Sequence, residues 1–269
     1  MKRPVAFFSA VVILLGMVAC ASSGDADLEA ARFALDSGDY DTAVTKAGAA
    51  LTADPADVDA ALVLSSAYSG KAGILLLDVT ADLSEESNTD NEFDAIHDSL
   101  FGDINATTGL DDLRSAIVTL NETLTPQPDA TNERYTDLQF QAGLLAAVEA
   151  FGLPSLTAQP TADGAIDASL ITSKDAVEDD FINADDNFIE SGLDATDTLI
   201  TNIRENYCVL RSLSGAAEGF DLDVLQDLTW CQLDPTGAAP TSVASCAAFT
   251  TKFATCSGAD DSELDSTKL

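Results

Sequence analysis

Cysteine and histidine are the side chains of this chain best suited to covalent or metal chemistry, and both are scarce. The sequence holds five cysteines and a single histidine, His97. Four of the cysteines lie in the last quarter of the chain, at intervals of 23, 15 and 10 residues. Metal sites use closer pairs such as C-x-x-C, so we expect no metal, and the lack of C-x-x-C-H excludes a c-type haem. An even number of cysteines in an exported chain predicts two disulfides, with three possible pairings among Cys208, Cys231, Cys246 and Cys256.

The fifth cysteine, Cys20, ends a segment with the features of an export signal. A short basic head is followed by an apolar run from Val5 to Val18. This run is shorter than the roughly 20 apolar residues of a membrane-spanning helix and has the length of a signal-peptide core. The ending MVAC resembles the lipobox of bacterial lipoproteins, although Met17 replaces the commoner leucine. The resemblance implies removal of residues 1–19 and lipidation of Cys20; the alternative is ordinary signal cleavage nearby.

The implied anchor leads to an expected location in the bacterial cell envelope. No aspartate stands at the two positions after Cys20. In lipoproteins of the enterobacterial type this favours the outer membrane. We therefore expect a lipid-anchored protein that faces the periplasm.

The charge of the chain limits the partners it can bind. Twelve lysines and arginines oppose 46 aspartates and glutamates, for a net charge of −34. Such a surface repels nucleic acid and anionic lipid headgroups. Hydrophobic residues make up 46% of the chain, which is enough for a folded core. Adaptation to a salty medium explains the acidity better than a dedicated cation-binding role, although both interpretations stay open.

No catalytic constellation is recognisable in the sequence. A triad would have to use His97, and no serine lies in a G-x-S-x-G motif. Phosphate-binding and dinucleotide-binding loops are also missing. Four aspartates, Asp179, Asp180, Asp185 and Asp186, lack the glycine and glutamate of a calcium loop, so we expect a solvated helix face. Nothing selects a carboxylate pair for glycoside hydrolysis. We expect no enzyme and no cofactor.

Helical periodicity dominates the first part of the mature chain. Apolar and small residues recur at helical spacing over 28–35, and Ser37-Gly38-Asp39 interrupts them. Asp39 or Asp41 then begins a second helix that ends at Pro55, and Asp57 begins a third. Small residues on the facing sides let antiparallel helices approach closely. Such a pair cannot bury its apolar face alone, so further pairs must stack on it.

These residues resemble the tetratricopeptide repeat family. The matching positions are Gly38, Tyr40, Ala43, Ala50, Pro55, Leu64 and Tyr68. The first helix departs from the family pattern at two large-residue positions, which hold Asp27 and Ala34. The pattern resumes with Ala116 and Pro128, at the same spacing as Ala43 and Pro55. The resemblance implies stacked antiparallel helix pairs over residues 20–152, that is, an all-α solenoid.

An insertion of residues 74–110 separates the two repeats. Its first residues are expected to prolong the third helix, and a polar acidic loop follows. Insertions in repeat proteins often supply the binding surface, so residues 80–106 are our candidate for a specificity element. His97 in this segment is expected to be a surface or half-buried residue.

The C-terminal part has a different organisation. Residues 153–172 form a connection, and 173–269 form a helical region tethered by the four cysteines. A further helical face is expected over 199–213, and short helices are expected around 224–233 and 243–253. Trp230 is expected to fill the core. A clear helical stripe comprises Val177, Phe181, Ala184 and Phe188.

Two functional hypotheses follow from this organisation. The favoured one is a lipid-anchored scaffold or assembly factor that binds envelope proteins or peptides in a helical groove, without catalysis. The alternative is a periplasmic lipoprotein of the same family that works with a solute transporter and carries a small ligand. A carrier needs a deep apolar pocket, whereas alanine-rich facing positions favour tight packing. The sequence leaves the partner and the oligomeric state undefined.

Overall fold

The computed structural model describes five stretches of the chain and a few single positions between 224 and 243. The stretches are residues 23–74, 108–125, 134–158, 174–214 and 245–259. Several predicted features lie outside the described residues: the segment 1–22 with Cys20, the candidate specificity element 80–106 with His97, Pro128 and Trp230.

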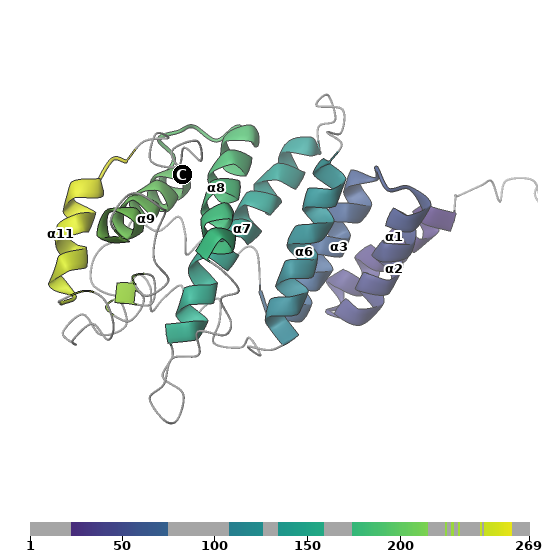
Figure 1. Ribbon diagram of the computed structural model, residues 1–269. Coiled ribbons are helices and arrows are strands. Elements are labelled where there is room, and N and C mark those ends of the chain that lie inside the picture. Colours follow the sequence, from purple (N-terminus) through teal and green to yellow (C-terminus); the bar gives the residue numbers. More distant parts are fainter. Residues whose placement is uncertain are drawn as a thin grey trace, which may run out of the picture.

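Every regular element in the described stretches is a helix, which confirms the all-α class. The helices are α1 (Ser23–Asp36), α2 (Tyr40–Ala53), α3 (Val58–Ala72), α6 (Thr108–Leu124), α7 (Tyr135–Ala158), α8 (Lys174–Glu190), α9 (Thr198–Ser214) and α11 (Ala247–Cys256). Each packs against the one before it, so the molecule is a row of helices with α1 and α2 at one end and α11 at the other (Figure 1). None of the described helices combines the length and hydropathy needed to cross a membrane.

The turn between α1 and α2 forms as predicted. Gly38 adopts a positive φ of 74°, a conformation that side chains disfavour, and Asp39 donates its N–H to the carbonyl of Ala34. The Asp39 side chain then accepts a hydrogen bond from the N–H of Thr42 and caps α2. Asp57 caps α3 in the same way, through the N–H of Ala60.

Small residues form the contact between α1, α2 and α3. Ala31, Ala47 and Leu64 make one buried cluster across the three helices. Leu28, Ala50 and Ala60 form a second, and Ala34, Ala43 and Ala67 a third. Alanine at these positions lets the helices pack closely, so the packing rests on shape rather than on large side chains.

Tyrosines occupy the spaces that the small residues leave. The ring of Tyr40 lies against Gly70, where an added Cβ would come within 2.3 Å of the ring. Tyr68 is half-buried and packs against both the large core and the Ala31 cluster. The two tyrosines thus fill the gaps between helices.

The expected prolongation of the third helix is wrong. Gly73 follows α3 with a φ of 89° and ends the helix, because the left-handed residue turns the chain away from the helix axis. At the far side of the insertion, α6 begins at Thr108.

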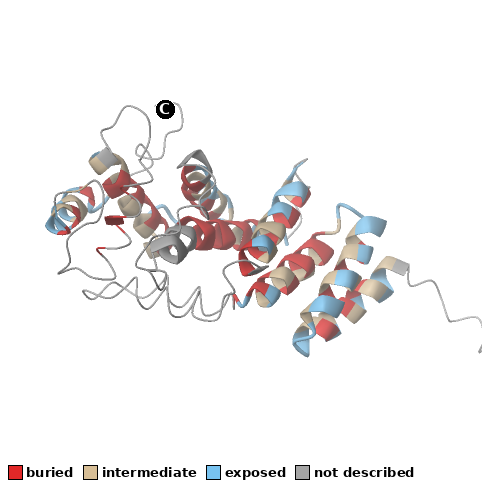
Figure 2. Cartoon of the chain, turned by 60° about the horizontal axis from the view of Figure 1, so that its bottom comes forward, coloured by how far each residue is buried: buried red, intermediate tan, exposed pale blue. Residues whose placement is uncertain are grey.

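Helix α7 is the centre of the molecule. Residues 141–150 are all buried, and the helix packs against α3, α6 and α8. Figure 2 shows buried residues gathered in the middle of the row, while exposed ones are more frequent at the N-terminal end. The helix extends to Ala158, beyond the expected start of the connection at 153. Pro154 lies within it and does not end it, although proline has no N–H to donate to the preceding turn.

The apolar stripe of α8 is buried as predicted. Phe188 packs against Gly143 of α7, whose lack of a side chain makes room for the ring. Phe181 stacks at a tilt on Tyr207 of α9, with ring centroids 5.9 Å apart. Leu199, Ile203 and Leu210 of α9 belong to the same core as the stripe. The stripe itself consists of Val177, Phe181, Ala184 and Phe188, all at most 1% exposed.

Candidate functional site

A polar surface crosses three alternate helices and is the strongest candidate for a partner-binding site. Asp59 of α3 lies between two arginines, with Arg32 Nη2 of α1 at 2.8 Å and Arg134 Nη2 at 3.4 Å. Two helical turns further along, the Gln141 side chain of α7 donates a hydrogen bond to Ser66 Oγ of α3 at 3.1 Å. Gln141 is buried and Ser66 is half-buried, so this bond links the two helices, whereas the arginines are partly exposed. We call these five residues together the α1–α3–α7 face.

The contacts of this face reveal how its helices run. Asp59 and Ser66 are seven residues apart on α3, and their partners Arg134 and Gln141 are also seven residues apart. Helices α3 and α7 are therefore parallel, with α6 packed against both. Helices α1 and α3 also pack directly against each other, with α2 in contact with both. Alternate helices thus share one continuous face.

The charges on the α1–α3–α7 face alternate along it. Arg32 also pairs with Glu29 at 2.9 Å, and Arg134 pairs with Asp137 at 3.0 Å. About half of the Arg134 side chain is exposed (53%). Guanidinium N–H groups and carboxylate oxygens bind the polar main chain and charged side chains of a protein partner. The face therefore has the chemistry of a recognition surface.

A second polar cluster lies at the junction of α6, α7 and α8. Glu149 of α7 is 8% exposed and accepts a hydrogen bond from Arg114 Nε at 2.8 Å. Asp180 of α8 belongs to the same cluster. Burial, with the negative charge of Glu149, raises the pKa of Asp180 to about 8, and Arg114 opposes this shift. Asp180 is therefore largely protonated at neutral pH.

The junction of α8 with α9 is also polar, and here the prediction of a solvated aspartate face is wrong. Asp185 is 2% exposed and holds Arg204 through two hydrogen bonds, of 2.7 and 3.0 Å. Buried Glu178 accepts a hydrogen bond from the Tyr207 hydroxyl. Only Asp179 and Asp186 of the four aspartates are exposed. Asp180 and Asp185 face neighbouring helices because they flank the apolar stripe.

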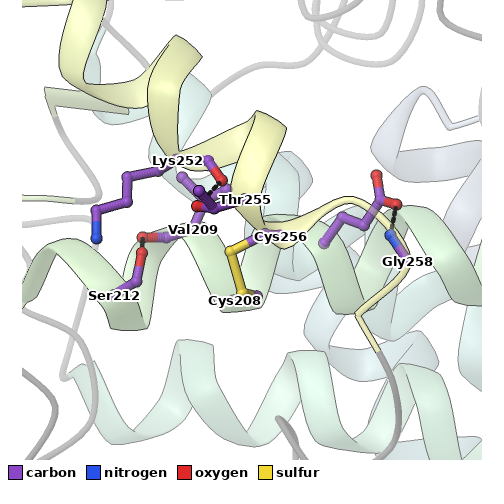
Figure 3. The surroundings of a disulfide bond; sticks show 8 residues. Cys208, Val209, Ser212, Lys252, Thr255, Cys256 and Gly258 are labelled. Atoms are coloured by element: carbon purple, nitrogen blue, oxygen red, sulfur yellow. Dashed lines mark hydrogen bonds between the residues drawn. A yellow bond between two sulfur atoms is a disulfide. The ribbon is translucent and has the colours of Figure 1, made fainter.

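Both predicted disulfides form, and the structure gives their pairing. Cys208 of α9 joins Cys256 at the end of α11, with Cα atoms 5.8 Å apart (Figure 3). Cys231 joins Cys246, 15 residues later. Beside the first disulfide, the N–H of Gly258 donates to the Glu205 carboxylate. Near the second, buried Asp227 accepts a hydrogen bond from the N–H of Val243 at 2.8 Å. These bonds attach α11 to the rest of the molecule.

The remaining predicted residues have structural positions. Ala43, Ala50 and Ala116 are buried at helix contacts, and Pro55 is exposed in the turn after α2. In the part of the chain that the structure describes, no group of histidine, cysteine and acidic side chains is placed to hold a metal ion.

Sequence reasoning missed the role of the basic residues. The chain has few of them, yet five join one helix to another through ion pairs, and a sixth, Arg134, joins the turn before α7 to α3. The low number of basic residues could have indicated this role. In so acidic a chain, a lysine or arginine finds an acidic partner on a neighbouring helix. The six are Arg32, Lys46, Lys71, Arg114, Arg134 and Arg204.

Comparison with known proteins does not assign the chain to a family. No protein-family model matches it, and neither a curated protein nor a solved structure is significantly similar to it.

Proposed function

We propose that the chain is a lipid-anchored scaffold or assembly factor of the bacterial cell envelope, built from tetratricopeptide-like helix pairs. It binds protein partners and catalyses no reaction. The observation that carries this proposal is the α1–α3–α7 face, a single polar surface shared by alternate helices. Parallel alternate helices with an antiparallel helix between them are the arrangement expected of stacked helical repeats.

The composition of this face supports a protein partner over a small ligand. Its arginine side chains are partly exposed, 39% for Arg32 and 53% for Arg134, and its glutamine and serine are linked across two helices. The neighbouring contacts of α1, α2 and α3 are filled by alanines, which brings the helices together directly. A carrier of small ligands would instead need an apolar cavity between them.

An affinity pull-down from the native envelope tests the proposal. The lipidated protein is captured after mild crosslinking, and both proteins and small molecules are identified by mass spectrometry. We expect a defined set of envelope proteins, reduced by Arg134→Glu and unaffected by the control Val118→Ala on the exposed side of α6. Deletion of 80–106 tests whether the insertion contributes. Recovery of a transporter component or a stoichiometric small ligand, without assembly proteins, would support the carrier hypothesis instead.

A further inference from the structure

Helix α1 has a large apolar side chain on its outer side. Phe33 is 77% exposed, more than any other large hydrophobic residue in the described parts of the chain. Its neighbours on the opposite side of the helix, Leu28, Ala31 and Ala34, are buried against α2 and α3. Because α1 is at the end of the row, no described helix covers this outer side (Figure 1).

The outer side of α1 is a strip of uncharged residues. Ala26 and Ala30 precede Phe33 by seven and three residues, so the three lie on one side of the helix. Glu29 borders the strip on one edge, where its carboxylate is paired with Arg32. Asp36, three residues after Phe33, is exposed on the same edge as Glu29, so Ala26, the half-buried Ala30 and Phe33 form a narrow uncharged strip beside these carboxylates. It suits an apolar and uncharged partner.

The distance to the expected lipid anchor indicates what that partner is. Cys20 is three residues before Ser23, the first residue of α1, so the acyl chains are within roughly 10 Å of the helix. Phe33 is ten residues further on, or about 15 Å along the helix axis. A helix attached so closely to a membrane can lie along its surface, and Phe33 then reaches the lipid.

We infer that α1 lies flat on the membrane surface, with Ala26, Ala30 and Phe33 in contact with the lipid. The phenyl ring occupies the boundary between headgroups and acyl chains, where an aromatic side chain leaves water without leaving the surface. The inference rests on the lipid anchor of the proposed function. The contact orients the protein, while the acyl chains supply most of the affinity.

This orientation leaves the candidate binding surface free. Successive residues of an α-helix point about 100° apart, so Arg32 and Phe33 face different directions. With Phe33 toward the lipid, Arg32 points sideways along the membrane surface rather than into the lipid. The membrane contact thus leaves the α1–α3–α7 face accessible to partners in the periplasm.

Tryptophan fluorescence in vesicles tests the inference. Phe33→Trp is prepared in the full-length lipidated protein, with Val118→Trp on α6 as the matched exposed control. Vesicles contain zwitterionic phospholipid with brominated acyl chains, which quench tryptophan only at short range. The unsubstituted protein supplies the baseline signal of Trp230. We expect a blue shift and a loss of emission for the Phe33→Trp variant, and neither change for the Val118→Trp variant.

The outcomes separate the inference from the proposed function. Flotation of the protein with the vesicles establishes the anchor first. Flotation without quenching of the Phe33→Trp variant, or with equal quenching of the Val118→Trp variant, overturns the contact but not the anchor. If the blue shift of the Phe33→Trp variant instead increases with protein concentration in the absence of lipid, Phe33 contacts a second copy of the protein. That result overturns the membrane contact. If the unsubstituted protein does not float with the vesicles, and the Cys20→Ser variant behaves identically, there is no lipid anchor. That result overturns both the anchor and the inference.

Discussion

The two ends of the molecule pack helices against each other with different chemistry. Between α1, α2 and α3 the contacts are made by alanines and a tyrosine on a glycine, and the ion pairs Lys46–Asp27 and Arg32–Asp59 are partly exposed. Between α8, α9 and α11 the contacts include large aromatic rings, a buried arginine–aspartate pair and a disulfide.

The difference shows which interactions each end depends on. Where helices pack by shape, stability depends on side-chain volume, because an added methyl group must displace a neighbour. Where helices are held by a buried ion pair and a disulfide, stability depends on keeping both charged partners, on pH and on the disulfide staying oxidised. We therefore expect perturbations of volume to act at the N-terminal end and perturbations of charge or redox state to act at the C-terminal end.

Removing one member of the buried ion pair should have the largest effect. Asp185→Ala leaves Arg204 charged and buried without its bidentate partner, which costs about 3–5 kcal/mol of unfolding free energy. Asp186→Ala, at the exposed neighbouring position, should change it by less than about 0.5 kcal/mol. Urea denaturation measures both. Equal losses for the two variants would show that burial of the pair does not matter.

Removing the disulfide between α9 and α11 should have the next largest effect. The double variant Cys208→Ser, Cys256→Ser should lose about 2–4 kcal/mol, because the unfolded chain is no longer constrained. Hydrogen exchange should accelerate in α11 while α1, α2 and α3 keep their protection. Uniform acceleration over the whole chain would mean that the two ends unfold as one unit.

A methyl group added at the N-terminal end should have a smaller but distinct effect. Gly70→Ala places a Cβ 2.3 Å from a ring atom of Tyr40, so the ring must move and stability should fall by about 1–3 kcal/mol. Gly48→Ala is the control, since nothing lies within 4 Å of its new Cβ and alanine favours the helix by about 1 kcal/mol. Thermal unfolding should therefore shift in opposite directions. A gain in both variants would contradict packing by shape.

The last effect should come from the carboxyl group of Asp180, and its size should depend on pH. Its pKa is about 8 in the folded protein and 3.8 in the unfolded chain, so the folded state holds the proton more tightly. Stability from this group is complete below pH 4 and is lost as the pH rises through 8. Asp180→Asn, which cannot ionise, should be more stable than the unsubstituted protein at about pH 9, by up to about 5 kcal/mol, and no more stable at about pH 4. A constant difference between the two proteins across this range would contradict the raised pKa.

The sequence predicted the helices better than their polar contacts. Caps such as Asp39 and Asp57, the glycine turn at Gly38 and the apolar stripe of α8 are local features, and their positions follow from residue type and spacing. Whether Asp185 or Asp186 is buried depends on where α9 lies, which no local pattern contains.

The candidate site was still harder to predict from sequence. Asp59 and Arg134 are 75 residues apart and come together only because α3 and α7 are parallel neighbours. The pairing of the cysteines is also a property of the fold, since spacing alone allows three connectivities. Disulfide formation, by contrast, could be predicted from the number of cysteines together with the expected export of the chain.

Site-specific photo-crosslinking in the native envelope tests the central claim most directly. A photoreactive amino acid replaces Asp137, beside Arg134 on the α1–α3–α7 face, or Val118 on α6 as the control. We predict that the probe in place of Asp137 captures a defined envelope protein and that the probe in place of Val118 does not. Capture of the same protein from the Val118 position alone, or from neither position in protein that is correctly anchored, would contradict the assignment of this face as the binding surface.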